Sequence, residues 1–329
     1  MKQAEPGIAI LGFPRSGTTL LRRLLDAHSA IDAPGETYLL SSCARFLEHQ
    51  RVVDGVDAGV LSGVSLLGMD SQKVLEQLRR MVQELRGEHA RNVGKSRWVE
   101  KTAIDAFHVD GIRRVFSDSL RYVLVVRHAL DVCVSTQEWC TRLESYPDEL
   151  HQYIVRNPQP LVAFAHAWVD VMQSLGKLRQ ELADRVFVVR YESLVAEPEV
   201  VLRGLLDFLD ESWEEGMLER ALADRKMDGF GDWKVHARGS VDDQSIGRWR
   251  RLSQGSLRQL APIVNPQLEE WEYDPVPTRG VDDPEEALRR YELGILLHAA
   301  QRPGPPRALR PADDSLESEV LSKSRSRES

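Results

Sequence analysis

The sequence has few cysteines, no long apolar run and no excess of positive charge. Its three cysteines among 329 residues have neither the density of a disulfide scaffold nor the spacing of a metal site, so buried, reduced thiols are expected. No apolar run approaches the length of a membrane span, and the polar residues 1–7 do not resemble a signal peptide. The net charge of −8 argues against nonspecific nucleic-acid binding, which depends on a basic surface. Composition therefore predicts a globular, cytoplasmic protein that binds neither membranes nor nucleic acids.

The chain does contain a regular alternation of apolar strands and helices. Apolar runs at 8–11, 122–126 and 186–189 are typical of buried parallel strands, and helical patterns follow each of them. This alternation predicts an α/β fold, a P-loop-like parallel sheet flanked by helices, with ligands at the carboxyl ends of its strands. The expected organisation is a domain at 1–275 with a mainly helical insertion at 38–97, a helix at 276–301 and a disordered tail at 302–329.

The turn after the first predicted strand has the composition of a phosphate-binding loop. Gly12 and Gly17 have the spacing Gly-x-x-x-x-Gly, and a helix follows at once, so backbone N–H groups and the positive helix end are aimed at one anion. Thr18 stands where a nucleoside triphosphatase has its phosphate-binding lysine, and the cation is Arg15 instead. This argues against binding of a β/γ-phosphate pair. The residues expected to bind the anion are Pro14, Arg15, Ser16, Gly17, Thr18 and Thr19.

A second anion site is expected where the second predicted strand ends. Arg127 closes that strand, and Ser135 follows eight positions later, about two helical turns into the next segment. A guanidinium at a strand end and a hydroxyl on the adjacent helix could both reach one phosphate, distinct from the one at the loop. Two such sites on one sheet indicate a nucleotide with phosphates at both ends of its ribose.

These elements resemble the binding motifs of sulfotransferases that use 3′-phosphoadenosine 5′-phosphosulfate (PAPS). Residues 14–19 resemble the loop that holds the 5′-phosphosulfate, and Arg127 with Ser135 resembles the pair that holds the 3′-phosphate. Residues 15–28, followed by Gly35-Glu36-Thr37, are similar to the branch that contains tyrosylprotein sulfotransferases and many bacterial relatives. The likeness covers about 7–274. Its other motifs are Glu100-Lys101-Thr102, Val189 to Leu194 and Ser245 to Trp249.

The resemblance implies transfer of a sulfuryl group from PAPS to an acceptor hydroxyl by in-line attack. It implies that Glu36 is the base that takes the proton of the acceptor. Lys101 and Arg15 suit the stabilisation of the charge that grows on the bridging oxygen. Further nucleotide contacts are expected from Tyr191, Lys234, Gly247, Arg248 and Trp249.

The acceptor is expected to be a small molecule or secondary metabolite. Tyrosylprotein sulfotransferases have an arginine after their Gly-Glu-Glu-Thr motif, whereas Tyr38 stands at that place here. A phenol, an alcohol, a sugar, an acyl chain and a peptide all stay open. His108 is the rival base, because cytosolic sulfotransferases use a histidine.

Two other functions are alternatives to sulfuryl transfer. One is a P-loop kinase or nucleotide hydrolase, and the other is a nonenzymatic nucleotide-binding module. No metal is expected, because no cluster of His, Cys and Asp has ligand spacing and the acidic pairs at 242–243 and 282–283 are typical of a turn and a helix cap. The amphipathic stretch at 287–299 is a candidate surface for a homodimer.

Overall fold

The computed structural model describes residues 7–53, 56–223, 243–277, 291–292 and 295. Within the part up to residue 277, a five-stranded sheet has the strand order β2-β5-β1-β6-β7, and every pair in it is parallel. The carboxyl ends of all five strands therefore lie at one edge of the sheet. The strands are β1 (Gly7–Leu11), β2 (Ile31–Asp32), β5 (Arg97–Glu100), β6 (Leu120–Val126) and β7 (Val186–Arg190).

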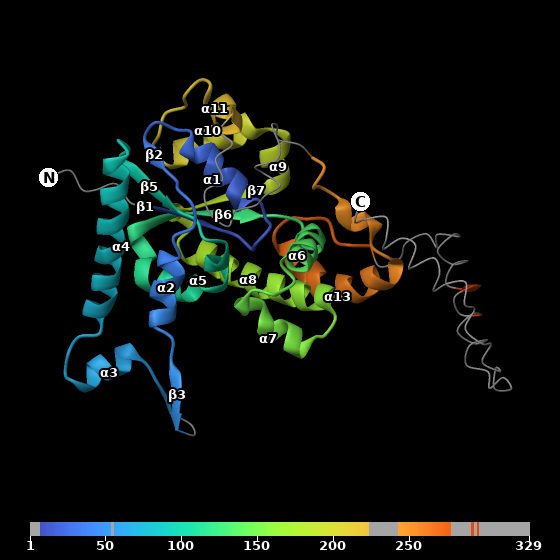
Figure 1. The fold of residues 1–329 in the computed structure, drawn as a ribbon, viewed down its shortest axis with the longest axis horizontal. Coiled ribbons are helices and arrows are strands. Elements are labelled where there is room, and N and C mark those ends of the chain that lie inside the picture. Colours follow the sequence, from blue (N-terminus) through green and yellow to red (C-terminus); the bar gives the residue numbers. More distant parts are fainter. Residues whose placement is uncertain (1–6, 54–55, 224–242, 278–290, 293–294, 296–329) are drawn as a thin grey trace, which may run out of the picture. The chain divides into compact units, whose positions relative to one another are not determined.

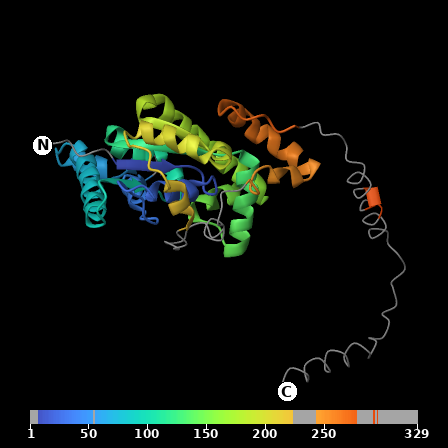
Figure 2. The ribbon, with the colours of Figure 1, turned by 90° about the horizontal axis from the view of Figure 1, so that it is seen from above.

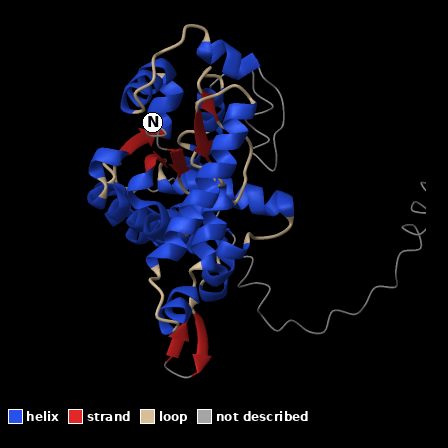
Figure 3. Cartoon of the chain, turned by 90° about the vertical axis from the view of Figure 1, so that its left-hand side faces the viewer, coloured by secondary structure: helices blue, strands red, loops and turns tan. Residues whose placement is uncertain are grey.

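Helices cover both faces of this sheet (Figures 1 and 3). On one face, Val123 and Val125 of β6 belong to a core shared with Leu194, in the helix that follows β7, and with three further helices. These helices are α1 (Thr18–Asp26), α10 (Pro198–Phe208) and α11 (Met217–Ala223).

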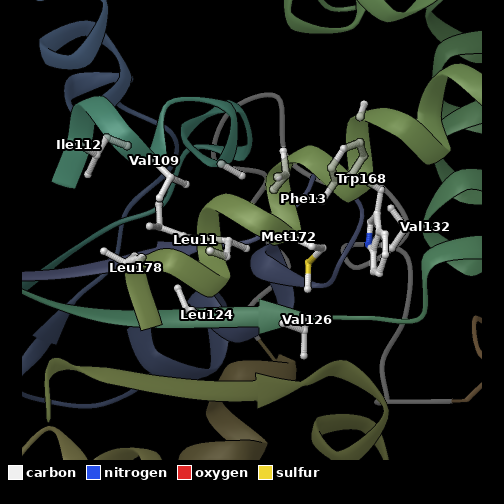
Figure 4. Packing of buried hydrophobic residues seen from close by; sticks show 14 of the residues in the cluster. Leu11, Phe13, Val109, Ile112, Leu124, Val126, Val132, Trp168, Met172 and Leu178 are labelled. Carbon is white, nitrogen blue, oxygen red and sulfur yellow. The ribbon is translucent and has the colours of Figure 1, made fainter. Parts of the chain in front are cut away.

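Leu124 and Val126 belong to the core on the other face, together with Trp168 and Met172 (Figure 4). The pleat sends successive side chains to opposite faces, and both faces are covered, so β6 is apolar at nearly every position. The helices on this side are α5 (Val109–Phe116), α6 (Ala129–Leu143), α7 (Asp148–Arg156), α8 (Pro160–Glu181) and α13 (Gln254–Glu270).

The insertion between β2 and β5 is mainly helical, as predicted. An antiparallel hairpin and a short helix extend from it away from the sheet (Figures 1 and 3), and α4 returns to pack against β5 (Figure 2). The hairpin was not predicted. The elements are α2 (Leu39–Phe46), β3 (Gln50–Val53), β4 (Val56–Ala58), α3 (Val60–Leu66) and α4 (Gln72–Asn92).

The three predicted strands are confirmed as β1, β6 and β7, but β2 and β5 were missed. These two strands have two and four residues, and Arg97 and Glu100 at the ends of β5 interrupt its apolar pattern. The predicted helix at 276–301 and tail at 302–329 fall outside the described residues, apart from residues 276–277, 291–292 and 295. Cys43, Cys133 and Cys140 are buried, unpaired thiols, as expected. Among the described residues, no helix has the length and apolar character that crossing a membrane requires.

Candidate active site

Each strand of the sheet delivers one element of the site at its carboxyl end. The loop at 12–17 follows β1, and Glu36 lies in the segment after β2. Lys101 follows β5 directly, and Arg127 follows β6. Tyr191 begins α9 (Tyr191–Ala196) directly after β7. Because the strands are parallel, residues that are far apart in the sequence converge at one edge.

The loop after β1 has the geometry of an anion cradle. Arg15 and Gly17 have left-handed backbones, with φ of 75° and 99°, and the N–H of Ser16 donates to the carbonyl of Phe13 at 3.0 Å. Helix α1 then begins at Thr18, so its unpaired N–H groups face the loop. Gly17 is also required for space, because a Cβ there would lie 2.3 Å from the ring of Tyr191. The prediction of a glycine-bounded turn ahead of a helix is confirmed.

Arg127 lies against this loop and is 4 % exposed. Its Nη1 donates to the carbonyl of Arg15 at 2.8 Å, and its Nη2 donates to the carbonyl of Ser245 at 2.5 Å. The guanidinium stacks over the ring of Tyr191, with Cζ 4.4 Å from the ring centroid. Its buried Nε–H has no hydrogen-bond partner among the described residues. A buried donor without an acceptor is costly, so this group is suited to an anionic ligand.

Ser135 adjoins the same cradle, because its Oγ accepts a hydrogen bond from Nε of Arg15 at 3.3 Å. The sequence predicted two separate anion sites. In the structure the two sites adjoin at Arg15, because both Ser135 and Arg127 contact this residue. Arg15 therefore connects the two predicted sites.

The Gly247-Arg248-Trp249 segment is fastened to α6 beside the cradle. The carboxylate of Asp131 accepts from the N–H of Gly247 at 2.7 Å and from the N–H of Trp249 at 3.1 Å. The ring of Trp249 stacks on His128, with centroids 4.9 Å apart. Arg248, at the start of the short helix η4 (Arg248–Arg251), forms an ion pair with Glu138 of α6.

Positive charge is concentrated here although the chain as a whole is acidic. Burial lowers the pKa of Arg248, and the nearby charges of Arg127, Arg251 and Arg15 lower it further, while Asp131 opposes the shift. Such a cluster of cations favours an anion. Burial also lowers the pKa of His128 to about 4, so this histidine is neutral at physiological pH.

Replacing Asp131 with asparagine is expected to weaken nucleotide binding. The amide keeps one acceptor but places an N–H₂ group against a backbone N–H, so the segment that carries Arg248 loses one of its two ties. We expect the Kd for 3′-phosphoadenosine 5′-phosphate (PAP), measured by calorimetry, to rise about tenfold. Asp148→Asn is the matched control, because that side chain is 96 % exposed at the start of α7. Equal affinities for the two variants would contradict this role of Asp131.

Lys101 and Glu36 form an ion pair at the edge of the cradle. Nζ of Lys101 lies 2.5 Å from Oε1 of Glu36 and 3.4 Å from the hydroxyl of Thr19 in α1. The N–H of Ala103 also donates to Oε1 of Glu36, at 3.3 Å. Lys101 is 3 % exposed, and burial lowers its pKa, although the charge of Glu36 opposes this shift. The ammonium group is thus placed between the start of α1 and a carboxylate.

His108, the rival base, contacts other charged side chains than Glu36 and Lys101. It lies 3.6 Å from the carboxylate of Glu48 and 3.7 Å from that of Glu149, and its Nε2 is 3.3 Å from Nε of Arg45. None of these residues belongs to the anion cradle, and within the described part of the chain His108 makes no hydrogen bond or ion pair with Lys101 or Glu36.

The structure therefore brings the predicted residues at 14–19, 36, 101, 127, 135, 191 and 247–249 to one edge of the sheet. Lys234 lies outside the described residues. Sequence reasoning missed Asp131 and Glu192, whose carboxylate accepts from the N–H of His128 at 3.1 Å and from the hydroxyl of Tyr273 at 2.8 Å. Asp131 lies four residues before Ser135, so the two share one face of α6, and this spacing was the available signal. Among the described residues, no group of three His, Cys, Asp or Glu side chains is placed to hold a metal ion.

The fold and the site define an α/β protein with a glycine-bounded loop and a cluster of cations at one edge of its parallel sheet. A sequence model of the sulfotransferase family matches residues 6–215. The chain therefore belongs to the sulfotransferase family, a family of enzymes.

Similar proteins include Nodulation protein NoeE of Sinorhizobium fredii, which is 25 % identical over 277 residues, or 79 % of this chain and 64 % of NoeE. Protein-tyrosine sulfotransferase 2 of Gallus gallus is 26 % identical over 85 % of this chain and 73 % of its own. The chain spans less than two thirds of NoeE, and 31 % of a similar uncharacterized protein of Aquifex aeolicus.

Solved structures share the fold. The sulfotransferase domain of the Synechococcus PCC 7002 olefin synthase superposes with a TM-score of 0.58 at 23 % identity, covering 83 % of this chain and 97 % of that domain. A sulfotransferase domain from the curacin biosynthetic pathway also has a TM-score of 0.58, at 21 % identity, and covers 84 % of this chain and all of that domain. The parallel sheet flanked by helices is therefore the sulfotransferase fold.

Proposed function

We propose that this chain transfers the sulfuryl group of PAPS to a hydroxyl of a small-molecule acceptor, with Glu36 as the base. The observation that carries the proposal is the position of Lys101, which contacts both Thr19 of the phosphate loop and Glu36. A sulfuryl group held at the loop would leave its phosphate beside this ammonium, and the carboxylate would receive the proton of the attacking hydroxyl. The cation that stabilises developing charge and the base that accepts the proton are thus in direct contact.

The nucleotide would bind at the sheet edge where the loop, Arg127 and Ser135 meet. The loop from Pro14 to Thr19 is suited to the 5′-phosphosulfate, because its N–H groups and the start of α1 face one place. Arg127 and Ser135 would hold the 3′-phosphate, and the unpartnered Nε–H of Arg127 supports this role. Tyr191 and the segment 247–249 would position the rest of the nucleotide. These groups serve binding and charge stabilisation without a metal ion.

A pocket of about 330 Å³ is the candidate acceptor site, and the rival base His108 is among the residues that line it. Phe107 lines it and packs edge-on against Phe13 of the loop, with ring centroids 5.4 Å apart. Its volume is at the lower end of the range for small-molecule sites, which supports a small acceptor. Glu48, Glu149 and Asp170 also line it, and three carboxylates would repel an acidic peptide.

Tyr38 is influenced both by the proposed base and by a carboxylate that lines this pocket. Its phenol hydrogen-bonds Glu36, and its pKa is raised by burial first and then by the charges of Glu36 and Glu149. Glu149, which lines the pocket, and Glu36, the proposed base, thus both raise the pKa of Tyr38. An acceptor in the pocket would meet Glu36 past Tyr38, which stands where tyrosylprotein sulfotransferases have an arginine.

Calorimetry with PAP tests the proposal first. Binding that does not change when Mg²⁺ is removed supports it, whereas Mg²⁺-dependent binding of ATP with no binding of PAP would establish the kinase or hydrolase alternative. The second test is release or transfer of ³⁵S-labelled sulfate from PAPS, with a panel of phenols, alcohols and sugars as acceptors. PAP binding without any release of label would identify a nonenzymatic binding module.

A further inference from the structure

The loop that carries Glu36 is fastened to the strand end that carries Lys101 by contacts at three successive positions. The residues on both sides of Lys101 bond to the two loop residues that follow Glu36. Glu36 pairs with Lys101, the hydroxyl of Thr37 donates to the carboxylate of Glu100, and the N–H of Tyr38 donates to the hydroxyl of Thr102 at 3.1 Å. The relative position of the proposed base and the proposed electrophile therefore depends on these flanking contacts.

Glu100 is the buried member of this set. It is 1 % exposed, and one of its carboxylate oxygens accepts from Thr37. The other oxygen forms an ion pair with Nε of Arg86, although the N–H does not point at it as a hydrogen bond requires. Burial raises the pKa of Glu100, and the charge of Arg86 is the largest effect that opposes this. The charge of Arg86 thus favours the ionised form of a buried carboxylate one residue away from Lys101.

Arg86 comes from the insertion helix α4 and is 4 % exposed. Its Nη2 donates to Asp32 at the end of β2 at 3.1 Å and to the carbonyl of Val99 in β5 at 3.3 Å. One side chain therefore joins the two strands from which Glu36 and Lys101 emerge. The proposed mechanism makes no use of this buried cation, which touches no part of the anion cradle.

The sequence pattern of α4 supports a dedicated role. Val82, Arg86 and Ala90 are buried at intervals of four residues, so a charged side chain occupies the middle of an apolar stripe. Such a position is costly unless the charge is paired. The pairing partners are Glu100 and Asp32, and His89 of the same helix also lies 2.9 Å from Asp32.

We propose that Arg86 is a positioning residue, which holds Glu100, and through Thr37 the loop of Glu36, in the register that sets this base against Lys101. This inference rests on the proposed function of that pair. Without the guanidinium, a buried carboxylate beside Lys101 has no cation of its own and competes with Glu36 for the ammonium group. The catalytic pair is then misplaced while the nucleotide cradle, built on β1, β6 and β7, stays intact.

The test compares Arg86→Met with the double variant Arg86→Met/Glu100→Gln. The rate of ³⁵S-sulfate release from PAPS is divided by the number of PAP-binding sites that calorimetry counts, so a partly unfolded preparation does not lower the result. We expect the rate per site to fall about tenfold or more in Arg86→Met while the Kd for PAP stays within about twofold. In the double variant the amide of Gln replaces the unpaired charge and can still accept from Thr37, so the rate should recover to within about threefold of the wild type.

Arg80→Met is the matched control, because Arg80 lies on the same helix in an ion pair with Glu84 that is largely exposed. It should match the wild type in rate, affinity and melting temperature. A wild-type rate per site in Arg86→Met, or a double variant no faster than the single one, would overturn the positioning role. Absence of sulfate release from the wild type would instead overturn the proposed function, so the two failures are distinguishable.

Discussion

Replacing Lys101 with alanine is expected to lower kcat by about 10²–10³-fold, with a much smaller change in the affinity for PAP. Removal of a buried donor aimed at developing charge has an effect of this size, because such a donor acts mainly in the transition state. The ammonium lies at the junction of Thr19 and Glu36, so it faces both the start of α1 and the proposed base. Steady-state kinetics with labelled PAPS and calorimetry with PAP measure the two quantities.

The pH dependence gives an independent check on Lys101. Burial lowers the pKa of Lys101 below its usual 10.5 in the unliganded protein. The ammonium form carries the charge, so kcat/KM should fall as pH rises through this lowered pKa, and the fall should begin below pH 10.5. The Lys101→Ala variant should lack this alkaline decline.

Lys177→Ala is the control for the Lys101 variant, because Lys177 is an exposed residue of α8.

Glu36→Gln should lower kcat by about 10²–10⁴-fold, the range of a general base. Because Lys101 and Glu36 are in contact, the double variant should lose little beyond the more damaging single change. An unchanged kcat in Glu36→Gln, with a loss in His108→Gln, would assign the base to His108 instead.

The second large effect is expected in nucleotide binding. Arg127→Ala should raise the Kd for PAP by about 10²-fold, because charge-assisted hydrogen bonds to a buried phosphate contribute about 1.5–3 kcal/mol each. Ser135→Ala removes one neutral hydroxyl and should raise the Kd by about tenfold. Calorimetry at one fixed salt concentration measures both values.

The control for this prediction is Arg121→Ala. Arg121 lies on the same strand, near the amino end of β6, where it bonds the carbonyl of Phe208 and the carboxylate of Asp210. Its replacement should leave the Kd for PAP unchanged. Equal affinities of wild type and Arg127→Ala, with both proteins folded by circular dichroism, would remove Arg127 from the nucleotide site.

The positions of the conspicuous motifs could be predicted from the sequence because each is a local pattern. The glycine-bounded turn at 12–17 needs only its own backbone and the following helix, and the apolar runs of β1, β6 and β7 are long enough to identify. The strands β2 and β5 could not be recognised in this way. Their residues are extended because they pair with other strands of the sheet. This pairing joins segments that are far apart in the sequence, such as Ile31 and Arg97, which are 66 residues apart (97−31=66).

The sequence by itself determined the class of fold, the phosphate loop and the family, because strand and helix periods and short motifs depend on neighbouring residues. Only the tertiary structure decided that Arg127 and Ser135 both contact Arg15. It also decided that Glu36 pairs with Lys101 beside Thr19. The tertiary structure also brought Arg86 of the insertion into an ion pair with Glu100. These contacts depend on the order and parallel direction of five strands, and a strand order is set by packing across the whole sheet rather than by any one segment.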